Sequence, residues 1–212
     1  MKRILFISTL LLSLSTFAQS ERYQSAMQKN LALFDSVQNT EKAQALAASF
    51  ERIGDAEKTE WLPYYYAALA MLTPAWMDPK IDKDQNAVKV KALIDKGDAL
   101  AKSDADRSEL QTLRNMVATQ QMLVDPQSRY ATYGAESASA LKKAQELNPN
   151  NPRAFYLEGI GIFNTPEQFG GGKTKAKPVL EKAVSLFNSE QVKPLYPTWG
   201  KKEAEQFLAQ AQ

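Results

Sequence analysis

The stretch AQELNPNNPRAFY, residues 144–156, decides how this chain folds. Ala144 is small enough to let two helices approach closely. Asn148-Pro149 ends the first helix, because proline lacks the backbone donor that a continuing helix needs. Phe155 then begins a new apolar stripe. The stretch therefore predicts two consecutive helices joined by a tight connection.

The same pattern recurs upstream at a regular spacing. Tyr64 and Leu110 open helices in the way that Phe155 does, and the spacings are 46 residues from Tyr64 to Leu110 and 45 from Leu110 to Phe155. A small residue follows four positions later in two cases, as Ala68 and Gly159. Self-similarity at a fixed period is typical of a repeat architecture.

Ala-x-x-Leu-Asn-Pro followed by Ala-aromatic-Tyr at 144–156 resembles the junction between two tetratricopeptide (TPR) repeats. The resemblance implies an all-α fold, a superhelical solenoid of αα-hairpins with a C-terminal capping helix. It is closest over 137–188 and weaker over the rest of 23–188. Arg114 and Ser137 stand where the family has small apolar residues, and the period exceeds the standard repeat of about 34 residues.

Apolar residues recur at helical spacing, and glycine and proline fall between these stretches. The helices that we expect are 22–37, 40–54, 60–73, 84–102, 107–124, 135–147, 152–164, 174–188 and 199–211. Thr40, Ser108 and Thr174 lie at or near expected helix starts, where a side-chain oxygen can cap the backbone. The expected hairpins are 22–54, 60–102, 107–147 and 152–188, all within a single domain, 19–212.

The extra length of each repeat lies in the turn inside its hairpin. The enlarged turns are Thr73 to Lys83, Asp125 to Gly134 and Asn164 to Lys173. Equivalent turns of a solenoid project from one edge, so these three should be neighbours. They carry the aromatic residues Trp76, Tyr130, Tyr133 and Phe169. These residues either form a binding rim or fold back to staple adjacent hairpins, and we favour stapling because buried aromatics stabilise a core strongly.

The C-terminal stretch 199–211 predicts an amphipathic helix that covers the end of the solenoid, with Trp199 as its anchor. The glycine-rich turn at 169–173, the enlarged turns and the Pro-x-Trp-Gly sequence at 197–200 also resemble exported bacterial tetratricopeptide proteins of unassigned function. This resemblance implies an exported protein but no particular ligand.

The N-terminus reads as a signal peptide, with Lys2 and Arg3 ahead of an apolar run that ends near Phe17. We expect cleavage after Ala18, which removes residues 1–18; the alternative is a buried first helix. The run is shorter than the roughly 20 apolar residues of a membrane span. The sequence thus predicts a soluble periplasmic or secreted protein, with no membrane span once the signal is removed.

Charge and composition limit the partners. Losing Lys2 and Arg3 leaves 26 − 2 = 24 basic residues against 24 acidic ones, a formal charge of zero. A nucleic-acid partner is therefore not expected, because binding to a phosphate backbone needs a basic surplus. A hydrophobic fraction of 44% is sufficient for a real core.

The residue types present leave few routes to catalysis. The sequence contains no histidine and no cysteine, which excludes catalytic triads, thiol nucleophiles and thiolate metal sites. Gly170-Gly171-Gly172-Lys173-Thr174 lacks the first glycine of a phosphate loop, because Glu167 occupies that position. The acidic residues around 79–86 lack the central glycine and final glutamate of a calcium loop. We therefore predict no catalytic, cofactor-binding or metal-binding residues, and no cofactor.

The tetratricopeptide resemblance implies a concave groove lined by the first helix of each hairpin. By that pattern the groove residues are Tyr65, Leu69, Gln111, Asn115, Tyr156 and Ile160. Such a lining suits a peptide or short helix with little charge, although the chain's own N-terminal hairpin could fill the groove instead.

The functional prediction is a periplasmic interaction module that binds a protein or peptide and is not an enzyme. One alternative is an all-α enzyme acting on envelope glycans with acids such as Glu158 or Glu167. It would need a carboxyl group of raised pKa and two carboxylates in one pocket. Another is an obligate structural subunit of an envelope assembly.

Overall fold

The computed structural model describes residues 21–34 and 39–212, and within these ranges the chain contains helices and no strand. The expected signal peptide lies outside the described residues. Residues 21–31 are helical. The elements that follow are α2 (Thr40–Glu57), α3 (Leu62–Ala75), α4 (Lys83–Leu100), α5 (Asp104–Met122), α6 (Pro126–Arg129), a π-helical turn (Tyr130–Gly134), α7 (Ala135–Leu147), α8 (Pro152–Asn164), a 3-10 turn (Glu167–Phe169), α9 (Lys173–Ser189) and α10 (Lys201–Gln210).

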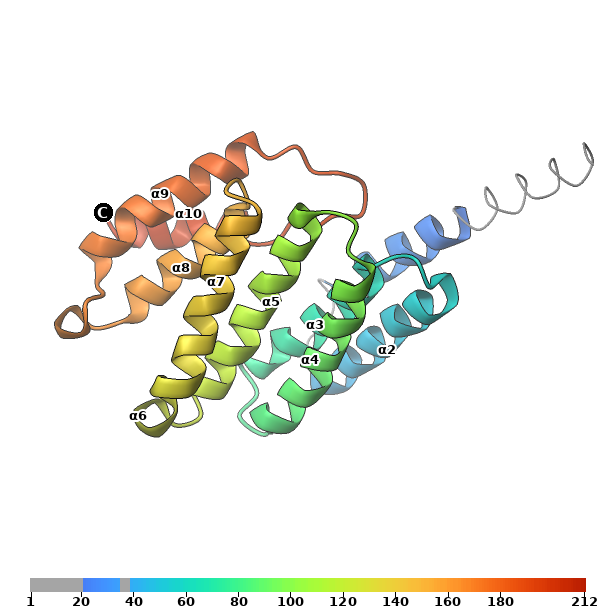
Figure 1. Ribbon diagram of the computed structural model, residues 1–212, viewed down its shortest axis with the longest axis horizontal. Coiled ribbons are helices and arrows are strands. Elements are labelled where there is room, and N and C mark those ends of the chain that lie inside the picture. Colours follow the sequence, from blue (N-terminus) through green and yellow to red (C-terminus); the bar gives the residue numbers. More distant parts are fainter. Residues whose placement is uncertain (1–20, 35–38) are drawn as a thin grey trace, which may run out of the picture.

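The helices follow one another along the long axis of the molecule (Figure 1). Successive helices pack together from α2 through α3, α4 and α5, and then from α5 through α7, α8 and α9. The last helix, α10, packs on α8 and α9 at the C-terminal end. The prediction of an all-α fold is confirmed. Within the described residues, none of the helices is long and apolar enough to cross a membrane.

Helix α3 lies at the centre of the core. Every residue from Leu62 to Ala70 is buried. A helix that is apolar on all sides must be enclosed on all sides, and α2, α4 and α5 cover most of α3. The remaining side is covered by the C-terminal part of the chain, which positions the site described below.

Helix starts follow ordinary capping chemistry. The side chains of Asn39, Asp82, Ser103 and Asn151 accept hydrogen bonds from backbone N–H groups in the first turns of α2, α4, α5 and α8. Ser108, expected near a helix start, is instead buried in the second turn of α5. Helix α5 therefore begins earlier than the sequence pattern indicated.

The region Asp125 to Gly134 was expected to be an enlarged turn outside the helices, but most of it is helical. Asp125 accepts hydrogen bonds from the backbone and hydroxyl groups of Ser128, and Pro126 occupies the first helical position. Both features favour a helix start. The segment forms α6 and a π-helical turn that runs directly into α7, so much of the enlarged turn is helical.

Polar residues replace small ones in the pair α5–α7, where the repeat pattern is weakest. Ser137 accepts a hydrogen bond from Asn115 at 2.7 Å and lies 2.9 Å from the hydroxyl of Thr119. Arg114, also on α5, forms an ion pair at 2.7 Å with Asp95 on the other side, on α4. Side-chain hydrogen bonds thus join these helices where the other pairs use close contact of small residues.

The contact between α8 and α9 depends on Gly159. A Cβ atom at this position would lie 2.6 Å from Cδ2 and 2.8 Å from Cγ of Leu180. We therefore expect Gly159→Ala to destabilise the fold by about 1–3 kcal/mol, because the packed helices would have to separate. Gly161→Ala is the matched control, since no atom lies within 4 Å of its added Cβ. Urea denaturation should show a loss at Gly159 and none at Gly161; equal losses at both positions would contradict the close-contact explanation.

Candidate functional site

The chain's own C-terminal segment crosses the face formed by α3, α5 and α8. We call residues Glu190–Gly200 the crossing segment. It leaves the end of α9, runs back over the molecule, and returns to the start of α10 (Figure 1). It is almost entirely non-helical.

Contacts with α3 hold the middle and the end of the crossing segment. The hydroxyl of Tyr66 donates to the carbonyl of Leu195 at 2.9 Å, and the indole nitrogen of Trp199 donates to the hydroxyl of Tyr65 at 2.7 Å. The ring of Tyr196 meets that of Trp61 edge to face, with centroids 5.6 Å apart. This side of α3 is therefore filled by the crossing segment.

Contacts with α5 and α8 continue the same pattern. Tyr196 donates to a carboxylate oxygen of Asp106 on α5 at 2.7 Å. Trp199 packs against Tyr156 of α8, with ring centroids 6.4 Å apart. Arg153 of α8 donates to the carbonyl of Pro197. The segment thus touches α3, α5 and α8, the first helices of three of the four expected hairpins.

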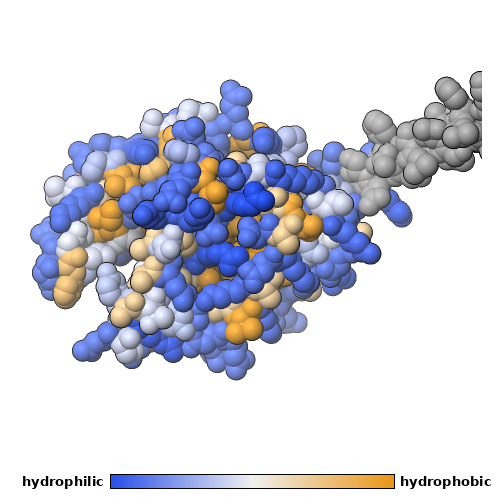
Figure 2. All heavy atoms as spheres, in the orientation of Figure 1, coloured by the Kyte–Doolittle hydropathy of each residue, from blue (hydrophilic) through white to orange (hydrophobic). Residues whose placement is uncertain are grey.

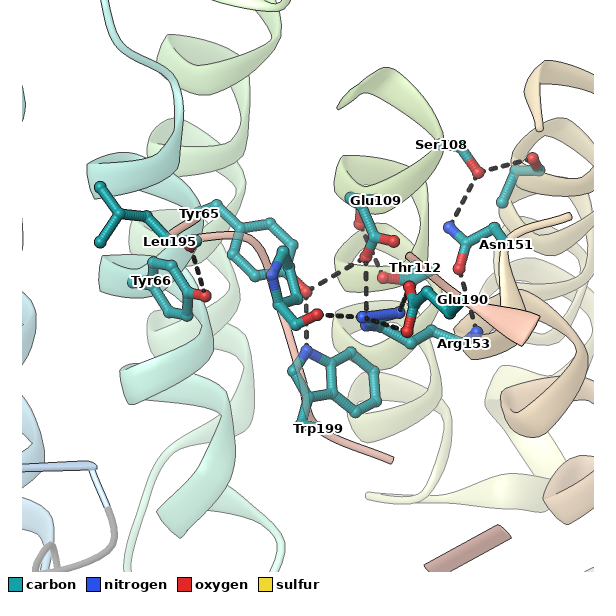
Figure 3. A network of polar contacts seen from close by, with 12 residues as sticks. Tyr65, Tyr66, Ser108, Glu109, Thr112, Asn151, Arg153, Glu190, Leu195 and Trp199 are labelled. Atoms are coloured by element: carbon teal, nitrogen blue, oxygen red, sulfur yellow. Dashed lines mark hydrogen bonds and ion pairs between the residues drawn. The ribbon is translucent and has the colours of Figure 1, made fainter. Parts of the chain in front are cut away.

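A buried ionic cluster lies beneath the segment (Figure 3). The side chain of Arg153 is 1% exposed; it bonds Glu190 at 2.7 Å and 3.3 Å, and its Nε lies 3.6 Å from Glu109. Tyr65 donates to Glu109 at 3.4 Å. Burial raises the pKa of Glu109 to about 7, although Arg153 opposes the rise. Burial also raises the pKa of Glu190, again against Arg153.

A cavity of about 420 Å³ adjoins this cluster. Its lining includes Glu109, Arg153, Glu190 and Tyr196. A raised carboxyl pKa and two carboxylates in one pocket are features that an acid-base enzyme would need. Here, however, both carboxylates are engaged by Arg153, which also bonds the crossing segment at Pro197.

The acids suggested for the enzyme alternative lie elsewhere. Glu158 accepts a hydrogen bond from Gln145 at 2.7 Å, between α7 and α8. Glu167 lies in the exposed turn before α9, beside Gly172. Neither lines the cavity beside Arg153.

The expected groove residues do not form an open groove. Tyr65 and Tyr156 are buried beneath Trp199, and Leu69 is buried within α3. Asn115 turns toward α7, where it bonds Ser137. Gln111 and Ile160 remain partly exposed. The expectation of an open concave groove was therefore wrong. The C-terminal segment, and not the N-terminal hairpin considered from the sequence, fills this face.

The three enlarged turns lie in order along one edge of the molecule (Figure 1). An ion pair at 2.9 Å between Arg129 and Asp84 joins the second turn to the start of α4, beside the first turn. Tyr133 is half-buried, with Lys91 and Arg129 each 5.8 Å from its ring centroid. Tyr133 therefore behaves as the staple that we expected.

The other aromatic residues of the turns do not fold back. Trp76 is 44% exposed, Tyr130 is 69% exposed and Phe169 is 75% exposed. Stapling was the wrong interpretation for these three. Nine large hydrophobic residues are exposed in the described part of the chain, and six of them lie in these turns or directly before one: Trp76, Met77, Leu123, Val124, Tyr130 and Phe169. Most of the exposed large hydrophobic side chains in the described part of the chain thus lie at the turn edge.

Four of these residues line one cavity of about 270 Å³ at the ends of α3 and α5, and we call them the edge patch: Trp76, Met77, Leu123 and Val124. Lys83 and Asp78 also line this cavity. A second cavity, of about 320 Å³, shares Met77 and Pro79 and continues toward Thr40. The face shown in Figure 2 differs from the edge patch, because hydrophobic residues on it form small separate spots. Clustered exposed apolar groups mark a binding surface more often than scattered ones do.

The glycine-rich turn before α9 has a conformational explanation. Gly170 and Gly172 have φ of 90° and 101°, values that side chains rarely allow, and a Cβ on Gly171 would lie 2.2 Å from the carbonyl of Thr165. The positive φ expected for this turn is confirmed at two positions. No group of three or more metal-ligating side chains was found among residues 21–34 and 39–212.

Comparisons with known proteins identify a relative. No family model matches the chain, and no curated protein matches it. Among solved structures, the chain is similar to the HusA haemophore from Porphyromonas gingivalis, with 38% sequence identity and a TM-score of 0.81. The match covers 90% of this chain and 92% of the other. At this identity over nearly the whole of both chains, the protein belongs to the same family as the HusA haemophore.

Proposed function

We propose that this protein is an exported, non-catalytic carrier that binds haem, or a closely related tetrapyrrole, at the edge patch. The observation that carries the proposal is the 38% identity to a haemophore over 90% of the chain. The signal peptide expected at residues 1–18 supports export to the periplasm or the exterior. The two carboxylates of the buried cluster are occupied by Arg153, which favours binding over catalysis.

The edge patch matches the chemistry of a tetrapyrrole. Haem is a flat apolar ring with carboxylate groups along one side, and it binds best to apolar and aromatic surfaces with a few polar groups at the rim. Trp76 supplies an exposed aromatic face, and Met77 is 82% exposed beside it. Lys80 is exposed on the same turn, so its ammonium group is available to the carboxylates. Lys83 lines the same cavity, and its ammonium group also donates to the carbonyl of Asp78 at 2.8 Å.

The acid at the patch is already engaged. Asp78 accepts hydrogen bonds from the hydroxyl of Thr40 at 2.7 Å and from the backbone of Lys80 at 2.9 Å. These bonds lower the pKa of Asp78. Its charge is therefore held within the turn instead of facing the apolar ring.

Ring contacts, rather than iron ligation, should supply most of the affinity. Haem iron in proteins is held mostly by histidine, cysteine, methionine or tyrosine. The chain has no histidine and no cysteine, and Met77 and Tyr130 are the exposed methionine and tyrosine in the turns. A thioether alone is a weak ligand compared with packing of the whole ring.

Titrations with haem and with metal-free protoporphyrin test this proposal. We expect both to bind saturably at one site, with dissociation constants within about tenfold of each other, because a tenfold difference corresponds to only 1.4 kcal/mol. Absorbance and tryptophan quenching would report binding. Absence of saturable haem binding would refute the proposed function. Haem binding without porphyrin binding would show that iron ligation dominates.

Two further proposals, about the scaffold and the partner, come from the sequence. We propose that the helix pairs are tetratricopeptide-type repeats, supported by Ala144, Gly159, Ala176 and Ala183 at close helix contacts. A protein partner, such as a receptor for the loaded carrier, fits the role of a carrier. A peptide in the concave groove would first have to displace the crossing segment.

A further inference from the structure

The crossing segment covers a face that α3, α5 and α8 already form by packing together. Aromatic residues at the start of α3 and on α8 lie directly beneath it, where Trp61 contacts Tyr196, and Tyr65 and Tyr156 contact Trp199. Both ends of the segment are attached to packed helices: Glu190 follows α9, and Gly200 precedes α10, which is fixed by buried Ala204. The segment could therefore lift as a loop without unfolding either helix.

The segment's own backbone stores some strain. Leu195 has φ of 67°, a left-handed conformation that residues with a Cβ adopt at a cost. It occupies the third position of a turn closed by the bond from Tyr196 N to Lys193 O at 3.1 Å, where glycine is usual. The closed conformation thus depends on side-chain contacts that outweigh this strain.

The buried charges beneath the segment do not balance. The groups that act on Glu109 come from several elements: Asp106 on its own helix, Tyr65 on α3, Arg153 on α8 and Glu190 on the crossing segment. Tyr196 of the crossing segment bonds Asp106. Arg153 pairs with two carboxylates, Glu109 and Glu190, and Asp106 adds a third negative charge close to Glu109. Lys193, which lines the adjoining cavity, is a second cation near the cluster. Excess negative charge in a poorly solvated cluster is costly, and adding one proton reduces it.

We propose that the crossing segment is a pH-sensitive latch over the face of α3, α5 and α8, with the buried Glu109–Arg153–Glu190 cluster as its sensor. Arg153 holds the segment through Glu190 and the carbonyl of Pro197. When the latch is open, Glu109 and Glu190 return to water. When it is closed, they share one buried cation.

The sign of the pH dependence follows from this arrangement. Burial raises the pKa of Glu109 from 4.5 to about 7, so the closed state binds a proton that the open state does not. Closure is therefore favoured in acid and lost as the pH rises through about 7. If opening restores an ordinary pKa, the ratio of open to closed latch should rise about tenfold between pH 6 and pH 8.

Hydrogen exchange of the purified protein, corrected for intrinsic rates, tests the latch. We expect the protection of amides in residues 191–200 to fall about tenfold from pH 6 to pH 8, while amides of α3 remain protected. In Glu109→Gln the charge is absent and the shape retained, so protection should be high and independent of pH. Glu190→Gln should also reduce the pH dependence. It provides the test if Glu109→Gln does not fold.

Glu158→Gln is the matched control, because Glu158 lies on α8 outside the cluster and bonds Gln145. It should keep the pH dependence of the unaltered protein. Protection that is flat or rises with pH in the unaltered protein would overturn the proposal. So would an unchanged pH dependence in both Glu109→Gln and Glu190→Gln. None of these readouts involves haem, so the latch and the carrier function can fail separately.

Discussion

Replacing Trp76 and Met77 together by serine is expected to weaken haem binding about 100-fold. Both side chains are exposed, at 44% and 82%, and both line the cavity of the edge patch. A few residues near the centre of a binding surface contribute about 2 kcal/mol or more each, aromatic residues are prominent among them, and the losses of neighbouring residues are not additive. A loss of roughly 3 kcal/mol corresponds to about two orders of magnitude in the dissociation constant. Titration by absorbance would measure it.

The matched control removes exposed apolar surface at another place. Val88 on α4 is 71% exposed and does not line the edge cavity. Val88→Ser should leave haem affinity unchanged. If the Trp76/Met77 variant binds haem as tightly as the unaltered protein and remains folded, the ligand does not bind at the edge patch.

Replacing Arg153 by alanine is expected to reduce the free energy of unfolding by about 3–5 kcal/mol, because removing one partner of a buried ion pair leaves the other uncompensated. Here two carboxylates, Glu109 and Glu190, would lose their shared cation, and Pro197 would lose a donor to its carbonyl. Urea denaturation followed by circular dichroism measures the change.

Arg114→Ala is the control for the loss of a charge alone. Arg114 pairs with Asp95 at 2.7 Å, but the side chain of Asp95 is 66% exposed. Water screens such a pair, so its removal should cost under about 1 kcal/mol. Similar losses in the two variants would show that the buried cluster contributes no more than a surface pair.

The sequence predicted the helical framework well where local signals were strong. Both helices around the stretch 144–156 have the predicted bounds, because Asn148-Pro149 ends α7 and Asn151 caps α8. Gly159 and Ala183 lie at close helix contacts as expected. These features depend on residues near one another in the chain, and such residues leave a readable pattern.

The crossing segment could not be predicted in the same way. Its bonds join residues 129 apart for Tyr66 and Leu195, and 134 apart for Tyr65 and Trp199. A non-helical segment has no periodicity to reveal its partner. The dense sequence Pro-Leu-Tyr-Pro-Thr-Trp at 194–199 was the available signal, since so many rigid and aromatic residues seldom lie in an unpacked tail.

Most of the aromatic residues of the enlarged turns were predicted incorrectly for a different reason. We expected them to be buried, because large aromatic side chains usually are. The turns themselves prevent this: α3 continues to Ala75, and Pro166 to Gly171 form a tight hydrogen-bonded turn that points Phe169 outward. Whether an aromatic side chain can reach the core depends on backbone geometry that the sequence pattern does not fix.

Hydrogen exchange measured with and without haem tests the central claim most directly. If haem lies on the edge patch, added protection should be confined to residues 74–83 and 122–134. Amides around Tyr65, Tyr156 and the crossing segment should be unaffected. Protection concentrated in the crossing segment and the helices beneath it, with none at the turn edge, would contradict the proposed site.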